Sequence, residues 1–168
     1  MRYLSRQRDV VGRRGASMEE LEALYRSRFD AFARVAASVA GDGARDAVQE
    51  GFATAVRRRR SFRGDGPLEA WVWRIVLNAA RTQARRHLPH PGLRGSEPLT
   101  PTVSDEGGVR AAVAGLPERQ RLAVFLRYYA DLDYDSIATA LGVKPGTVAA
   151  TLNAAHATLR GRLEEVPL

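Results

Sequence analysis

A segment near the middle of the chain divides the sequence into two helical halves. Residues 88–108 contain four prolines and four glycines, with several serines and threonines. Proline lacks the amide donor that a helix needs, and glycine loses the most backbone entropy on folding, so this composition supports neither a helix nor a packed core. We therefore predict a flexible linker at 88–108 that joins two small domains, at 18–87 and 109–163.

The first half carries three helical patterns. Ser17 and Glu20 have the spacing of a capping box and predict a helix that begins at residue 18 and ends before Gly41. A second helix is predicted at 44–60 and a third from Pro67 to about residue 87, because proline suits the first turn of a helix. The expected buried stripe of the third helix follows a helical period. It consists of Leu68, Val72, Ile75 and Ala79.

The second half predicts a helix-turn-helix. A short helical piece at 109–115 is followed by a helix that Pro117 opens, with apolar residues on one side. Two further helices lie on either side of Gly142, the second of them opened by Pro145. No long stretch alternates as a β-strand does, so the predicted fold class is all-α.

The charge of the chain indicates a polyanionic partner. The 26 basic and 19 acidic residues leave a formal net charge of +7, and the basic excess lies in the first half. Residues 1–17 contain five arginines and one aspartate, without a sustained apolar period. We expect this N-terminal extension to be disordered, and we expect 164–168 to be a short tail.

Several classes of protein are disfavoured. The chain has no cysteine, which excludes disulfides and thiolate metal sites, and no apolar run long enough for a membrane span. Its three histidines stand outside any zinc-protease pattern, and phosphate loops and serine-nucleophile elbows are absent from the sequence. We expect a cytoplasmic protein that is not an enzyme, without membrane insertion and with neither cofactor nor metal.

The third helix carries a row of polar side chains. Arg74, Asn78, Arg81 and Arg85 are spaced by four, three and four residues, which places them on one face. Such a row can follow a phosphate backbone, although a solvated charged face is the plainer alternative. Two tryptophans, at 71 and 73, flank the row. We expect one of them in the core, while the other could stack on an unpaired base.

The helix-turn-helix predicts a second nucleic-acid contact. In this motif the N-terminal part of the second helix enters the major groove. That geometry nominates Lys144, Thr147, Ala150 and Thr151. The alternative is a pair of helices that only pack together.

These residues resemble a known family. The stretches 46–52 and 70–78, with Phe62 before and Arg85-Arg86 after the second of them, resemble region 2 of the extracytoplasmic-function sigma factors of the sigma-70 family. The stretches 116–121, 126–129, 134–138, 141–143 and 146–148 resemble region 4 of the same family. The two resemblances occur in the family's order on either side of the linker.

The resemblance implies a sigma factor that directs core RNA polymerase to its promoters. It implies docking on the clamp helices of the β′ subunit by Asp46, Gln49, Glu50 and Phe52. The minus-10 element would be melted and held by Trp71, Arg74, Asn78, Arg81, Arg85 and Arg86, with the loop 61–67 as a possible pocket for an extruded base. Region 4 would read the minus-35 element and contact the β flap. The resemblance also implies an anti-sigma partner and a monomeric free state.

The chain departs from the family in its last helix. Alanine, threonine and histidine occupy positions 149, 151, 154 and 156, where relatives usually carry lysine or arginine. Without bidentate arginine contacts we expect weak minus-35 readout. Two alternatives therefore stay open: a degenerate sigma-like protein, or a helix-turn-helix regulator that acts without polymerase.

Overall fold

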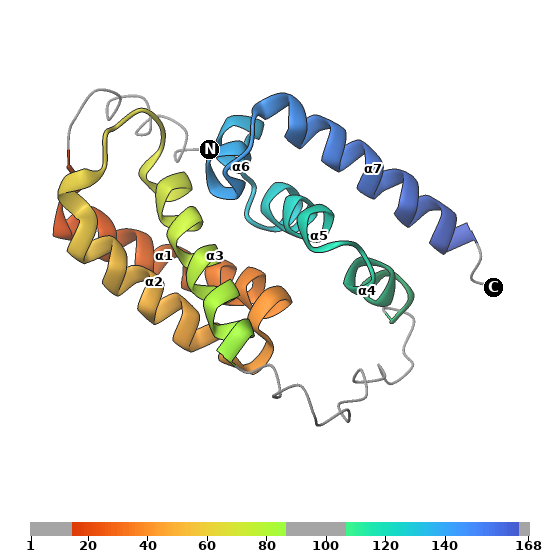
Figure 1. Cartoon of the computed structure of the whole chain (residues 1–168), viewed down its shortest axis with the longest axis horizontal. Helices are drawn as coiled ribbons and strands as arrows, with labels where there is room; N and C mark the ends of the chain where they lie inside the picture. Colours follow the sequence, from red (N-terminus) through yellow and green to blue (C-terminus); the bar gives the residue numbers. More distant parts are fainter. Residues whose placement is uncertain (1–14, 87–106, 165–168) are drawn as a thin grey trace.

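The computed structural model describes residues 15–86 and 107–164 as helices and the turns between them (Figure 1). A first helical group consists of α1 (Met18–Ala40), α2 (Ala44–Arg58) and α3 (Leu68–Arg86). A second helical group consists of α4 (Gly107–Ala114), α5 (Glu118–Val124), α6 (Tyr134–Leu141) and α7 (Pro145–Glu164). The described ranges contain no strand, which confirms the all-α class. Residues 1–14 of the extension, 88–106 of the linker and 165–168 of the tail lie outside the described residues. Residues 15–17, which were expected to be disordered with the rest of the extension 1–17, are ordered, because Gly15 and Ala16 bond to the loop before α3 and Ser17 caps α1.

The start of α1 is fixed by the capping box that the sequence predicted. The Ser17 backbone amide donates to Glu20 Oε2 over 2.8 Å, and the Glu20 amide donates to Ser17 Oγ over 3.1 Å. These bonds satisfy two amides that the first turn of a helix leaves without partners. Gly41 ends the helix with a φ of +54°, a backbone conformation that favours glycine.

Aromatic rings dominate the core of the first group. Phe32 and Trp73 are fully buried and stack with ring centroids 3.9 Å apart, while Phe52 meets Phe32 edge-on at 5.1 Å. The Trp73 Nε1 donates to Glu69 Oε1 over 3.2 Å, so its polar atom also has a partner. One tryptophan of the pair at 71 and 73 was expected in the core, and it is Trp73.

The buried face of α3 is wider than the sequence predicted. Val72 is buried as expected, but Leu68, Ile75 and Ala79 are only half-buried. The core-facing positions are Ala70, Val72, Trp73, Val76, Leu77 and Ala80. The reason is that α3 packs against α1 and α2 and also against α6. Its buried surface therefore extends around more of the helix than one stripe of residues spaced by three and four positions.

The second group departs from regular helix at one point. After α5 the chain makes a π-helical turn over Phe125–Tyr129, in which the Ala130 amide donates to the Phe125 carbonyl over 3.0 Å. The extra residue shifts the apolar face, so Leu126 is buried while Tyr129, three residues further on, is 39% exposed. The sequence did not predict this turn.

The helix-turn-helix forms as predicted. Asp133 caps α6, since its Oδ1 accepts from the Ser136 amide over 2.7 Å. Gly142 ends α6 in the left-handed conformation, with a φ of +68°, and α7 begins at Pro145. Val148, Leu152 and Ala155 of α7 are buried, which fixes the face that it turns toward the rest of the second group.

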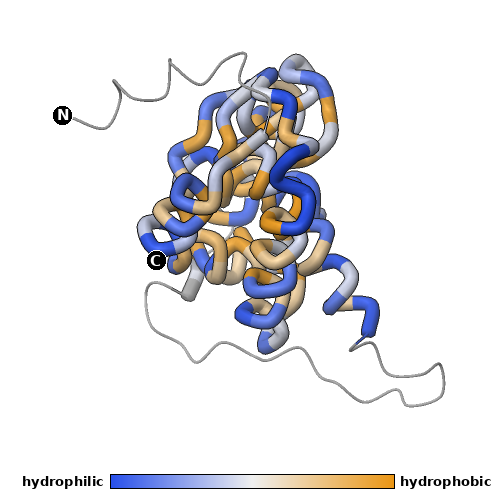
Figure 2. The backbone as a smooth tube through the Cα atoms, turned by 90° about the vertical axis from the view of Figure 1, so that its left-hand side faces the viewer, coloured by the Kyte–Doolittle hydropathy of each residue, from blue (hydrophilic) through white to orange (hydrophobic). Residues whose placement is uncertain are grey.

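The two helical groups pack against each other. The contacts run chiefly between α3 and α6, and a smaller set joins α1 to α5 (Figure 1). Arg121 Nη2 donates to the Ser38 carbonyl over 2.9 Å, and the Arg28 guanidinium donates to the Ala130 carbonyl. Buried residues of both groups belong to one apolar cluster, and Figure 2 shows hydrophobic positions recurring along the packed helices. This is a closed arrangement of the chain.

Glycine at position 51 lets α2 and α3 approach closely. A Cβ placed on Gly51 would stand 2.7 Å from Val76 Cγ2 and 2.8 Å from Val76 Cα. The second contact is with backbone, which cannot move aside as a side chain can. Gly161 in α7 offers the opposite case, because nothing lies within 4 Å of its Cβ position.

We expect Gly51→Ala to lower the free energy of unfolding by about 1–3 kcal/mol, the usual cost of overpacking a well-packed core. Gly161→Ala, the matched control in an open helical position, should raise it by roughly 0.5–1 kcal/mol because alanine loses less backbone entropy. Urea unfolding of the purified chain, followed by circular dichroism, measures both. Equal effects of the two variants would contradict the close helix contact.

Candidate nucleic-acid interface

The polar row of α3 lies on one face of the helix, as its spacing predicted. Arg74 and Asn78 are exposed, Arg81 is half-buried, and Arg85 and Arg86 are exposed at the end of the helix. Arg81 Nη1 is 3.5 Å from Asn78 Oδ1, so these two neighbours also contact each other. The row presents several guanidinium donors along one helix.

Part of this row is occupied by the second helical group. Arg81 Nε donates to Glu118 Oε1 of α5 over 2.9 Å. Arg74 lies beside the turn of the helix-turn-helix, where an ideal Cβ on Gly142 would stand 3.8 Å from its Nη2. In the closed arrangement Arg81 is therefore paired with the second group, whereas Arg74 stays exposed beside it.

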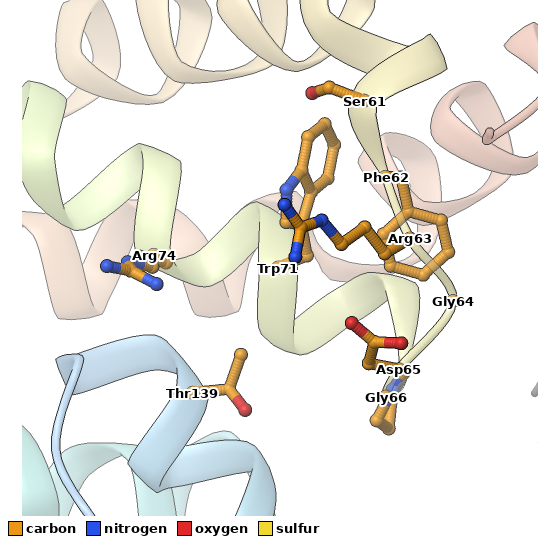
Figure 3. A pocket seen from close by; sticks show the side chains of 10 residues that line it. Ser61, Phe62, Arg63, Gly64, Asp65, Gly66, Trp71, Arg74 and Thr139 are labelled. Atoms are coloured by element: carbon orange, nitrogen blue, oxygen red, sulfur yellow. The ribbon is translucent and has the colours of Figure 1, made fainter. Parts of the chain in front are cut away.

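A cavity of about 350 Å³ lies beside the start of the row (Figure 3). It is lined by the loop 61–67, by Trp71 and Arg74 of α3, and by Thr139 of α6. Trp71 is half-buried and its ring meets that of Phe62 at a centroid distance of 5.5 Å. An indole held at the wall of a cavity, with an arginine beside it, is suited to stacking on an unpaired base.

The loop that forms this cavity is held from two sides. Phe62 is buried, and its carbonyl accepts from the Gly15 amide over 2.7 Å. The Ala16 amide donates to the Arg59 carbonyl over 2.8 Å. The chain that enters α1 therefore braces the loop, a contact between segments over 40 residues apart in the sequence that the sequence analysis missed.

The predicted docking residues on α2 fall into two sets. Asp46, Gln49 and Glu50 are exposed, and Glu50 pairs with Arg57 over 3.0 Å. Phe52 instead is 6% exposed and packs edge-on against Tyr25. In this arrangement the three polar residues are available to a partner, whereas Phe52 supports the helix from inside.

The predicted reading face of α7 has few free donors. Lys144 and Ala150 are exposed, and Thr147 and Thr151 are half-buried, with the Thr151 hydroxyl donating to the Thr147 carbonyl over 2.7 Å. Sequence reasoning missed Asn153, which is exposed three residues after Ala150 on the same face. The three-residue spacing from Ala150 could have identified Asn153 as part of this face. Its side-chain amide is of the type that pairs with adenine in the major groove.

Histidine and acidic side chains of the described ranges form no cluster that could hold a metal ion. No helix of these ranges is long and apolar enough to span a membrane.

Two family models match the chain in separate segments. The Sigma-70 region 2 model matches residues 24–88, and the Sigma-70, region 4 model matches residues 107–159. These segments correspond closely to the two helical groups.

Curated relatives are similar over most of the chain. The ECF RNA polymerase sigma factor SigM of Mycobacterium tuberculosis is 32% identical over 155 residues, which cover 89% of this chain and 78% of SigM. The RNA polymerase sigma-E factor of Streptomyces antibioticus is 29% identical, covering 86% and 85%. The RNA polymerase sigma-H factor of Pseudomonas aeruginosa is 31% identical, covering 62% of this chain and 65% of its own length.

Solved structures share the fold. The sigma factor RpoE of Bartonella quintana, in complex with the anti-sigma factor NepR, matches with a TM-score of 0.69 at 22% identity, covering 89% of this chain and all of that one. CnrH, in complex with the cytosolic domain of CnrY, matches with a TM-score of 0.67 at 21% identity, covering 90% and 92%.

Proposed function

Because this chain belongs to the extracytoplasmic-function sigma factors of the sigma-70 family, which act in transcription initiation, we propose that its two helical groups bind different parts of the promoter and of the polymerase. Residues 18–87 serve as region 2, which binds core polymerase and the minus-10 element. Residues 109–163 serve as region 4, which binds the minus-35 element and the β flap, and 88–108 link the two. Sigma factors are not themselves enzymes, and this one works in the cytoplasm.

The observation that carries the minus-10 assignment is the cavity at Trp71 next to the row of α3. Trp71 offers a ring to an unstacked base, and Arg74 is positioned for the adjoining phosphate. Asn78, Arg81 and Arg85 extend the same face along the helix, and Arg86 adds a further charge at its end. Unstacking a base costs a few kcal/mol, which pocket and phosphate contacts offset.

Promoter binding requires the two groups to separate. Glu118 and the turn at Gly142 occupy part of the face that the minus-10 strand would use. In this proposal the closed arrangement is the resting form of the free monomer. Core polymerase stabilises an open form, in which the two helical groups are apart. The solved relatives bind anti-sigma factors or a cytosolic domain, and we propose a partner of this kind for the closed form.

Recognition of the minus-35 bases by α7 is weak. Ala150 donates no hydrogen bond, and the Thr151 hydroxyl already has an acceptor in its own helix. Lys144, Thr147 and Asn153 remain as contacts to the major groove. Specificity at this element then depends mainly on thymine methyl contacts and on Asn153.

The docking assignment is tested with Asp46→Ala/Gln49→Ala. Both side chains are exposed on α2, so we expect the variant to fold normally and to bind core RNA polymerase about tenfold more weakly or worse, as loss of central interface contacts does. Titration of labelled chain with core polymerase in the absence of DNA measures the affinity.

The matched control is Glu22→Ala/Ser27→Ala, which removes one carboxylate and one polar group from the exposed side of α1. It should bind polymerase as the unaltered chain does. An equal loss in both variants, or a loss in neither, would show that polymerase docks elsewhere.

A further inference from the structure

Two arginines join the helical groups through backbone carbonyls at helix ends. The Arg28 guanidinium of α1 donates to the Ala130 carbonyl just after the π-helical turn. In the other direction, Arg121 Nη2 of α5 donates over 2.9 Å to the Ser38 carbonyl in the last turn of α1. Carbonyls at a helix end lack a partner within the helix, and the helix dipole favours a cation beside them. Each group thus supplies an arginine that binds a helix end of the other.

Arg28 is oriented by contacts within its own group. Its Nε donates to Glu69 Oε1 over 2.9 Å, and the same oxygen accepts from the buried Trp73 Nε1 over 3.2 Å. The side chains of Arg28 and Glu69 are 30% and 14% exposed, so their ion pair is partly shielded from water. Because these contacts do not involve the second group, they persist when the groups separate. Closing the chain therefore costs little side-chain entropy at Arg28.

The acceptor of this contact makes Arg28 important for closure. Ala130 is fully buried, and its carbonyl faces the first group, since Arg28 reaches it from there. Without the guanidinium, the closed form would keep this carbonyl from water without its charged donor. In the open form, water can take the place of the donor. A buried polar group that loses its partner bears the full cost of desolvation, so the loss penalises the closed form alone.

The contact of Arg121 is weaker for a physical reason. Its Nη1 donates to the Ala114 and Leu116 carbonyls of its own group over 3.1 and 2.9 Å, which leaves Nη2 for Ser38. Its Nε, however, is buried and has no hydrogen-bond partner within the described ranges. This unpaired donor offsets part of the gain, and a substitution at Arg121 would remove both the bond and the cost.

The remaining side-chain bridge between the groups is more exposed. The side chains of Arg81 and Glu118 are 30% and 46% exposed, and such pairs contribute little to stability. Positions 28 and 38, in contrast, are roughly 15 Å apart along α1, given a helical rise of about 1.5 Å per residue. The second group is thus held at two separate points of one helix, which restricts its rotation about either point.

We propose that Arg28 is the main latch that keeps the free chain closed, and that Arg121 is a second, weaker latch. Closure places Glu118 on Arg81 and Thr139 at the wall of the cavity described above. The latch therefore regulates access to the row of α3. This regulatory role rests on the proposed function, whereas the closure of the free chain does not.

The test measures the separation of the two groups in the free full-length chain. The chain contains no cysteine, so Ala23→Cys in α1 and Ala157→Cys in α7, both at exposed positions, carry one spin label each. Double electron–electron resonance gives the distribution of distances between the labels. We expect one short-distance population in this background. Adding Arg28→Met should produce a longer-distance population and raise the ratio of open to closed chain at least roughly tenfold, as loss of a hydrogen bond to a charged group does.

A second variant separates opening from loss of fold. Arg28→Lys keeps a cation beside Glu69, but a single ammonium cannot copy the guanidinium fork that bonds both Glu69 and the Ala130 carbonyl. It should shift the distances in the same direction as Arg28→Met. Circular dichroism should show unchanged helix content for Arg28→Lys. A distance distribution that stays closed in Arg28→Lys would overturn the latch.

Matched controls come from the same two helices. Arg26→Met in α1 and Arg119→Met in α5 each remove one exposed arginine and the same charge. Both should leave the distances unchanged, and Arg121→Met should open the chain by a smaller factor than Arg28→Met. Equal opening by Arg28→Met and Arg26→Met would overturn the specific role of Arg28.

The regulatory role has its own readout. A partner that binds the open form has its apparent affinity lowered by the fraction of chain that is open. Arg28→Met should therefore bind core RNA polymerase more tightly, by the factor by which its open fraction rises. An opened variant that binds polymerase no more tightly would overturn the regulation. Failure of the proposed function is distinguishable, because then the unaltered chain does not bind core polymerase whatever its label distances.

Discussion

The Trp73→Ala variant is expected to lose about 3–5 kcal/mol of its free energy of unfolding, the usual cost of removing a buried tryptophan. Trp73 is fully buried, stacks on Phe32 at 3.9 Å and donates to Glu69. The substitution leaves a cavity between α1 and α3 and removes one of the two donors to Glu69 Oε1, which keeps its ion pair with Arg28. Since small domains have about 5–15 kcal/mol in total, this loss is a large fraction of the stability of the first helical group.

Trp71→Ala is the matched control for this prediction. The same side chain is half-buried at the wall of the cavity, so its loss should cost far less stability and act on promoter opening instead. Thermal and urea unfolding measure the first effect, and permanganate footprinting of holoenzyme on a promoter measures the second. Equal destabilisation by both variants would contradict the different roles of the two tryptophans.

The second large effect is expected from Arg74→Ala/Arg81→Ala. Each hydrogen bond to a charged group is worth about 1.5–3 kcal/mol, so losing two phosphate contacts should reduce open-complex formation roughly a hundredfold or more. Binding to core polymerase should be retained, because the predicted docking residues lie on α2. Open-complex lifetimes and single-round transcription with reconstituted holoenzyme measure the loss.

Glu118→Gln serves as the control for this second prediction. It removes the ion pair to Arg81 across the two helical groups without altering the row itself. We expect initiation at least as strong as that of the unaltered chain, because a contact of the closed form is weakened. If Glu118→Gln lost as much activity as the double variant, the arginines would matter for the closed form and the DNA assignment would fail.

Features set by neighbouring residues were predictable from the sequence. The capping box of Ser17 and Glu20, the Asp133 cap and the Gly142 turn each depend on residues within a few positions of one another. Their chemistry is local, so the three-residue spacing and the residue types predict them. The helices of both groups and the helix-turn-helix follow from such signals.

Features that depend on distant residues were not predictable. Ile75 and Ala79 were expected in the core, but α6 packs on α3 from a direction that the sequence of α3 alone does not reveal. The pairing of Arg81 with Glu118 joins residues 37 positions apart across the linker. The brace from Gly15 to Phe62 is a backbone contact, and backbone amides leave no signature in residue type.

The sequence predicted the polar row of the candidate site, but it did not predict which of the two tryptophans lies beside that row. The spacing of Arg74, Asn78 and Arg81 on one face followed from helical geometry, and one of two tryptophans was expected to be free. Which tryptophan is free depends on the ring of Phe32, which only the fold brings to Trp73. The roles of these residues on DNA, and that of Phe52 behind the docking face, stay predictions.

The most direct test of the account is promoter-dependent transcription. Purified chain is added to core RNA polymerase on fragmented genomic DNA from the source bacterium, and the transcript starts are mapped. We predict discrete starts that share a minus-10 sequence and have a poorly defined minus-35 sequence. A chain that binds no core polymerase and adds no starts over polymerase alone would contradict the account.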